Sequence, residues 1–132
     1  MHPDFEFETA RVGEILREDE CQVKAEDIER FRRLLGYPPS APGTQPSAPA
    51  SMGLTYGLKL GWEHEIFPPG AVRMGDDNVF GVSAKPGDRL TTALRITERW
   101  KSKGRKFMKY EMLTRNQRGE MVCSVNVVGM LP

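Results

Sequence analysis

The chain has 132 residues, of which 28% are charged and 39% hydrophobic, and Lys plus Arg exceed Asp plus Glu by one. A chain of this length builds one domain with a hydrophobic core, so we expect a single domain over residues 1–132. The even balance of charge argues against nucleic acid or an acidic membrane as a partner.

The sequence contains two cysteines, Cys21 and Cys123. They are too few for a disulfide framework or a metal site, so we expect no bound metal and reduced thiols in a cytoplasmic protein. The N-terminus has acidic residues around Phe5 and Phe7 and not the basic segment and apolar run of a signal peptide, so we expect no signal peptide here. No stretch is apolar over a length that would cross a bilayer, so we expect no membrane span.

The first 22 residues are interpreted as an N-terminal arm. Their apolar side chains are compatible with an edge strand or with a docked segment, and the sequence leaves both open. These side chains are Phe5, Phe7, Val12, Ile15 and Leu16.

A helix is predicted over residues 25–35. Glu26 and Asp27 lie in its first turn, where carboxylates suit the helix dipole. Gly36 follows as a C-terminal stop. The apolar stripe of this helix consists of Ile28, Phe31, Leu34 and Leu35. Residues 37–49 contain five prolines, which remove backbone donors and restrict the preceding residues, and are therefore predicted to form a surface loop.

The central element is a helix predicted over residues 51–67, with Ser51 as its N-cap and Pro68 after its end. Apolar side chains recur along it every four residues, at Leu54, Leu58 and Trp62. Glycines recur at the same spacing, at Gly53, Gly57 and Gly61. A helix glycine costs about 1 kcal/mol relative to alanine, so we expect a compensating close approach of another backbone along the glycine stripe.

The rest of the chain reads as antiparallel strands joined by short turns. Residues 71–84 are predicted to form one irregular strand or a weak pair, with a solvated turn at 76–78. Three long strands follow, whose apolar side chains alternate with polar ones. The predicted inner faces are Leu90, Thr92, Leu94, Ile96 and Trp100, then Met108, Tyr110 and Met112, then Cys123, Val125 and Val127. A sheet that is apolar on one face needs a cover, which the central helix supplies. The predicted fold is therefore α+β, a single hot-dog fold in which a curved antiparallel sheet wraps one long helix.

Three segments also resemble a known family. They are Ala-Pro-Ala-Ser-Met-Gly at 48–53, Lys-Pro-Gly-Asp-Arg-Leu at 85–90 and Asn-Gln-Arg-Gly-Glu at 116–120. In this order, and over roughly residues 23–129, the chain resembles the MaoC-like (R)-specific enoyl-CoA hydratases and acyl dehydratases, in particular their N-terminal-type dehydratase half. Active members carry Gly-Asp-x-Asn-Pro-x-His after the first helix, where Asp and His flank a water. Here residues 35–42 read Leu-Gly-Tyr-Pro-Pro-Ser-Ala-Pro, without either residue. The resemblance therefore implies a non-catalytic half that shapes an acyl tunnel while a partner chain supplies the Asp and His.

A substrate-binding site is expected at the start of the central helix, where backbone N–H groups carry the positive end of the dipole. In the resembling family this place polarises a thioester carbonyl. The candidate residues are Ala50, Ser51, Met52, Gly53 and Tyr56. An ordinary helix start remains the alternative. No cofactor is expected apart from the ligand, an acyl-CoA or acyl-carrier-protein thioester.

The candidate acid/base residues are Glu63, His64 and Glu65, because hot-dog thioesterases often place a carboxylate on the central helix. Neighbouring helix residues diverge by about 100°, so at most two of the three face one cavity, and a polar helix end is the alternative. Three functions are thus open: a hydratase or dehydratase subunit that binds an acyl thioester, a non-enzymatic acyl-thioester or lipid-binding module, and an acyl-CoA thioesterase. A homodimer, or a heterodimer with another hot-dog chain, is expected because a sheet edge remains open.

Overall fold

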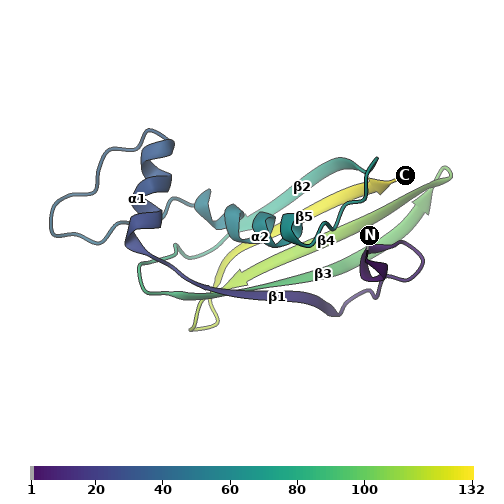
Figure 1. The fold of residues 1–132 in the computed structure, drawn as a ribbon, viewed down its shortest axis with the longest axis horizontal. Helices are drawn as coiled ribbons and strands as arrows, with labels where there is room; N and C mark the ends of the chain where they lie inside the picture. The colour runs from purple at the N-terminus through teal and green to yellow at the C-terminus, as the bar shows by residue number, and fades with distance from the viewer. Residues whose placement is uncertain (1) are drawn as a thin grey trace.

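A computed structural model describes residues 2–132 and confirms the α+β hot-dog fold. Two helices and one five-stranded antiparallel sheet follow a short 3₁₀ turn at Pro3–Phe5. The elements are β1 (Ile15–Gln22), α1 (Ala25–Leu34), α2 (Met52–Glu63), β2 (Val72–Phe80), β3 (Arg89–Ser102), β4 (Arg105–Arg115) and β5 (Met121–Leu131). The strand order is β1-β3-β4-β5-β2, so β1 and β2 are the two edges. Helix α2 lies across the sheet, while α1 stands apart at one end (Figure 1).

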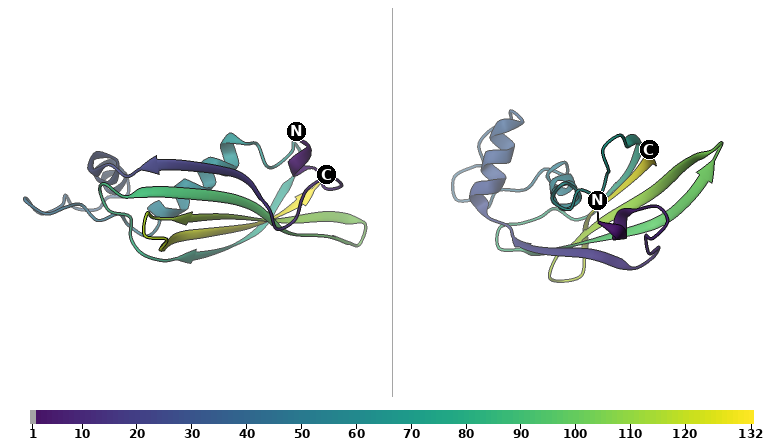
Figure 2. Two further views of the ribbon diagram at one scale, coloured as in Figure 1. Left: turned by 90° about the horizontal axis from the view of Figure 1, so that it is seen from below. Right: turned by 45° about the vertical axis from the view of Figure 1, so that its right-hand side comes forward.

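The glycine stripe of α2 faces the sheet, as predicted. A Cβ atom added at Gly53 would lie 3.0 Å from the Cβ of Cys123, and one added at Gly57 would lie 2.9 Å from the Cβ of Met112. At Gly61 it would lie 3.1 Å from Cδ1 of Ile66. The bare stripe therefore lets the helix sit low on the concave side of the sheet, where Figure 2 shows it.

The apolar stripe of α2 points elsewhere. Leu58 is 37% exposed and Trp62 is 86% exposed, although both were expected to help cover the sheet. Because the glycines occupy the contact with the sheet, the large side chains on the adjoining face are left without a covering element in this chain. The predicted stripe on α1 is also only partly buried, since Ile28 is inaccessible whereas Leu34 is 78% exposed.

Helix α2 ends at Glu63, four residues before the predicted end. The N–H of Glu65 donates to the carbonyl of Trp62 and the N–H of Ile66 donates to the carbonyl of Gly61, which is a Schellman motif. Glu65 takes the left-handed position, with φ of 49°, where glycine is usual. The early stop was missed because no glycine marks it.

The N-terminal segment combines both predicted alternatives. Residues Ile15–Gln22 form the edge strand β1, paired with β3. The residues before it dock on the sheet through Phe5, which is inaccessible to solvent, and Arg17 of β1 donates to the carboxylate of Asp4 at 2.8 Å.

Two strand predictions need correction. In β3 the register with β4 shifts between Ile96 and Glu98, so Trp100 lies on the opposite face from Ile96 and stacks on Phe107, with ring centroids 5.4 Å apart. In β2, Asp76 and Asp77 are strand residues paired with β5 rather than a solvated turn. The alternative of a single irregular strand in this region is confirmed, because the ladder shifts between Arg73 and Gly75.

Candidate functional site

An open groove of about 1090 Å³ lies on the concave side of the sheet. One wall is the outer face of α2, with Leu58 and Trp62, and the floor is formed by Met112 and Val127 of the sheet. The segment between α2 and β2 closes one end through Phe67 and its neighbours. The groove therefore runs along the C-terminal half of α2, and its lining is mostly apolar.

Charged side chains line the same groove. Lys59 and Glu65 come from α2 and its C-terminal cap, and Arg73 comes from the start of β2. Arg73 is held by Asp76, whose Oδ1 accepts from its Nε at 2.7 Å. The groove thus offers apolar surface beside two cationic groups, an arrangement that suits an acyl chain with an anionic head group.

The three candidate acid/base residues diverge. Glu65 is exposed and lines the groove, whereas the carboxylate of Glu63 lies 3.7 Å from the Lys59 ammonium on the helix surface. His64 is the half-buried C-cap residue of α2 and is not part of the groove lining. Of the three, only Glu65 is therefore placed to meet a molecule in the groove.

The helix start is more closed than expected. The N–H of Met52 donates to the carbonyl of Pro49 at 2.9 Å and that of Gly53 to the carbonyl of Ala50 at 3.0 Å, so neither donor is free. Ser51 makes no side-chain cap and lies exposed beside Ala50. The cavity next to these residues measures about 20 Å³, which is room for about one water molecule.

Tyr56 lies away from the groove. It packs against a second core cluster that includes Val23, Ile28 and Met52. Burial, and then the neighbouring Cys21, raise the pKa of the Tyr56 hydroxyl to about 12. Its place between α2 and the β1–α1 side of the molecule makes it a packing residue in this chain.

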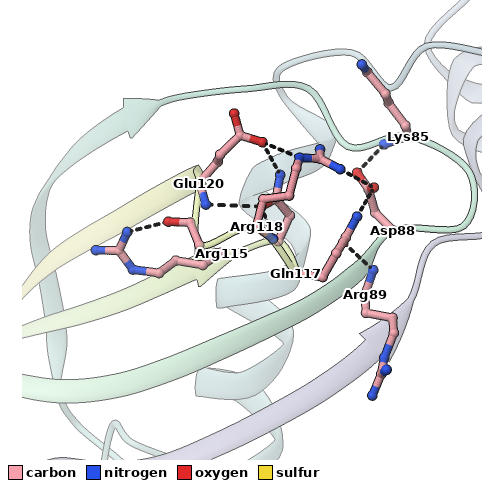
Figure 3. A network of polar contacts seen from close by, with 9 residues as sticks. Lys85, Asp88, Arg89, Arg115, Gln117, Arg118 and Glu120 are labelled. Atoms are coloured by element: carbon pink, nitrogen blue, oxygen red, sulfur yellow. Dashed lines mark hydrogen bonds and ion pairs between the residues drawn. The ribbon is translucent and has the colours of Figure 1, made fainter.

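Two turns, at residues 85–88 and 116–120, meet across the end of the sheet (Figure 3). Asp88, which is 4% exposed, accepts from the Lys85 N–H at 3.0 Å and from Nε2 of Gln117 at 2.9 Å. Burial alone would raise the pKa of Asp88, but these hydrogen bonds and the nearby Arg118 outweigh it and hold the pKa below its usual value. Ala84, directly before the first turn, and Val122, shortly after the second, line the small cavity at the helix start.

The loop after α1 carries neither the Asp nor the His of the Gly-Asp-x-Asn-Pro-x-His motif. Within residues 36–42 the one hydroxyl besides Tyr37 is that of Ser40, which donates to Glu29 of α1 at 2.5 Å. Of the two histidines, His2 is near Asp4 in the N-terminal segment and His64 caps α2. Among residues 2–132, no group of three His, Cys, Asp or Glu side chains is arranged to hold a metal ion.

Sequence reasoning missed three features of the groove. Arg73, Phe67 and Lys59 all line the groove. Phe67 reaches it through the turn at Glu65, whose left-handed backbone is not marked by a glycine in the sequence. The spacing of Arg73 and Asp76 gives no hint of their pairing, because residues three apart lie on opposite faces of a regular strand. In neither helix of the described chain does an apolar run reach the length of a membrane span.

This architecture is the hot-dog fold, in the form found in MaoC-like dehydratases and R-hydratases. The chain is similar to a MaoC-like dehydratase from Rhodospirillum rubrum, with a TM-score of 0.75 at 18% identity over 94% of each chain. It is similar to the unliganded R-hydratase PhaJ1 from Pseudomonas aeruginosa, with a TM-score of 0.72 at 18% identity over 96% of this chain and 84% of that one. It is also similar to a chain of the C-terminally truncated HadBC (3R-hydroxyacyl-ACP dehydratase) complex from Mycobacterium tuberculosis, with a TM-score of 0.65 at 20% identity over 85% of this chain and 90% of that one. No protein-family model matches the sequence, and no curated protein matches it. The likeness predicted from the sequence is thus confirmed at the level of the fold.

Proposed function

We propose that this chain is a subunit of a MaoC-like (R)-specific enoyl-thioester hydratase or 3-hydroxyacyl dehydratase. In this proposal it binds the acyl part of a thioester and pairs with a second hot-dog chain that supplies the Asp and His. The observation that carries the proposal is the open, mostly apolar groove of about 1090 Å³ on a hot-dog scaffold whose 36–42 loop has no Asp or His.

The chemistry of the groove supports an acyl thioester as ligand. Leu58, Trp62 and Phe67 offer apolar surface for the chain, and Lys59 and Arg73 would meet phosphate or carboxylate groups of the carrier. The helix start contributes no free pair of donors, because the N–H groups of Met52 and Gly53 are engaged and the groove borders the other end of α2.

Binding can be tested through Trp62, which lies on the groove wall. The variant Trp100→Phe leaves Trp62 as the single tryptophan of the chain. We expect octanoyl-CoA to shift the Trp62 emission to shorter wavelength and free coenzyme A to shift it far less. Leu58→Glu, on the same wall, should weaken the octanoyl-CoA response about tenfold, whereas Lys24→Glu, remote from the groove, should leave it unchanged. An unchanged spectrum with octanoyl-CoA would contradict the proposal.

Catalysis is tested separately. The purified chain should not hydrate crotonyl-CoA, and hydration should appear when a hot-dog chain carrying Gly-Asp-x-Asn-Pro-x-His is added. Binding of octanoyl-CoA without hydration in any mixture would favour the non-enzymatic acyl-thioester or lipid-binding module instead.

A thioesterase is the second candidate, and the position of Glu65 in the groove favours it. In that case a water oriented by the Glu65 carboxylate would attack the thioester carbonyl, releasing a free thiol and a carboxylic acid. Glu65→Gln should then abolish thiol release from octanoyl-CoA, while Glu63→Gln, which alters only the surface pair with Lys59, should not. Absence of thiol release from the unaltered chain removes this candidate.

A further inference from the structure

The two edges of the sheet differ in what they offer a neighbour. Edge strand β1 carries consecutive charged residues from Arg17 to Glu20, which protect an edge against pairing. Edge strand β2 instead exposes large apolar side chains: Val72 is 47% exposed, Met74 53%, Val79 48% and Phe80 47%. Because β2 also borders the open groove, we take β2 as the edge at which a second chain joins the sheet.

The charges of β2 lie at its centre. Asp76 pairs with Val127 and Asp77 with Asn126, so the two carboxylates lie on opposite faces of the sheet. The irregularity between Arg73 and Gly75 brings Arg73 onto the groove face, where it bonds Asp76. Asp77 is in no ion pair within residues 2–132. Each copy of β2 therefore presents a net negative charge at mid-strand.

Two copies of β2 related by a two-fold axis would place these charges together. In an antiparallel pair with that symmetry, the residue on the axis lies opposite its own copy. The register with the greatest overlap has Asp76 on the axis, and the next one has Asp77 there. Like charges directly opposite each other destabilise a strand pair, and this applies most directly to Asp77, because Arg73 offsets the charge of Asp76. A register centred on Gly75 would lay Met74, which has no partner in β5, into the ladder on both sides of the axis.

We propose that β2 pairs with the edge strand of a different hot-dog chain, one that carries Lys or Arg opposite Asp76 and Asp77, rather than with a second copy of this chain. This inference rests on the pairing in the proposed function and specifies the partner by its charge. The same carboxylates then give attraction to the correct partner and repulsion between identical copies.

A charge-reversal variant of this chain can serve as a partner with a positive β2 edge. Asp77→Lys changes the mid-strand charge from negative to positive, so a mixture of the unaltered chain and this variant supplies opposite charges across the edge. In sedimentation velocity at low salt, we expect each protein alone to be largely monomeric and the equimolar mixture to associate about tenfold more tightly than either. Raising the salt concentration should reduce this gain. Glu18→Lys makes the same charge change on β1 and is the matched control, which should not associate with the unaltered chain.

The outcomes distinguish the choice of partner from pairing at the β2 edge itself. A tight dimer of the unaltered chain that Asp77→Lys weakens would overturn the inference and leave pairing itself intact. Equal association with Glu18→Lys would also overturn it, because the charge of the whole molecule would then suffice. No association in any mixture would overturn the inference about this edge. The paired subunit of the proposed function is tested separately, by adding the hot-dog chain that carries Gly-Asp-x-Asn-Pro-x-His, and octanoyl-CoA binding is measured through Trp62.

Discussion

The two ends of helix α2 differ in how they are enclosed. At the N-terminal end, small residues such as Ala50, Gly53 and Ala84 line a cavity of about 20 Å³, whereas the C-terminal half borders a groove of about 1090 Å³. Resemblance to the hydratases drew attention to the N-terminal end, where the family polarises a thioester. The difference teaches that in this chain the open groove and the helix start, where the resemblance led us to expect the thioester, lie at opposite ends of one helix.

Gly57, at the middle of α2, allows the close approach of the helix to the sheet. Gly57→Val should lower the free energy of unfolding by about 3 kcal/mol, because its Cβ would lie 2.9 Å from the Cβ of Met112 and 3.1 Å from Cγ2 of Val125. Urea denaturation measures the change. Leu58→Val, on the exposed neighbouring face, should change stability by less than about 0.5 kcal/mol. Equal effects of the two substitutions would mean that the glycine stripe does not hold the helix against the sheet.

Substitution of Asp88 tests how much the hydrogen bonds between the turns at 85–88 and 116–120 stabilise the chain. Asp88→Asn should lower the free energy of unfolding at pH 7 by about 2 kcal/mol, because a buried hydrogen-bonded carboxylate is lost. The pKa of Asp88 is lower in the folded chain than its ordinary value of 3.8. Its contribution is therefore present above that value and fades as the pH falls through the folded pKa, so the variant and the unaltered chain should converge in acid. The exposed Asp19→Asn on β1 is the control, and a pH-independent difference for Asp88→Asn would contradict the explanation.

Substitution of Glu65 tests the Schellman motif that ends α2 beside the groove. Glu65→Gly should raise the free energy of unfolding by about 1 kcal/mol, because glycine takes the left-handed conformation without the steric cost that glutamate has there. Glu63→Gly, two residues earlier in the last turn of α2, should lower it by about 0.5–1 kcal/mol. Thermal or urea unfolding measures both, and a loss of stability in Glu65→Gly would argue against the Schellman motif.

Trp62 gives the smallest expected effect on the isolated chain. Because its side chain is 86% exposed, Trp62→Ser should change the free energy of unfolding by less than about 0.5 kcal/mol. The same substitution should remove much of the groove wall that octanoyl-CoA would contact under the proposed function. A large loss of stability would mean that the C-terminal half of α2 is less open than its exposure indicates.

Much of the fold could be predicted because its elements repeat with a clear period. The alternation from Leu90 to Ile96 identified both the strand and its buried face, and the spacing of Gly53, Gly57 and Gly61 identified the contact with the sheet. Trp100 was placed on the wrong face because a one-residue shift in register reverses every later side chain and leaves no mark in the sequence.

The site was less predictable. The apolar stripe with Leu58 and Trp62 looks the same in sequence whether it covers its own sheet or remains open for another molecule. The groove also depends on the path of the chain after Glu65, which a residue other than glycine directs. The residues at the helix start were identified from the family, but the hydrogen bonds that engage their N–H groups depend on the turn at Pro49, which the sequence does not specify.

The fit of Gly53 over Cys123 has a practical consequence. Burial raises the pKa of the Cys123 thiol, so at neutral pH it is protonated as well as covered by α2. An alkylating reagent reaches it only in molecules where the helix has lifted from the sheet. In a Cys21→Ser background, the rate at which Cys123 is labelled would therefore report how often α2 lifts from the sheet. A bound acyl chain or a docked partner should lower this labelling rate.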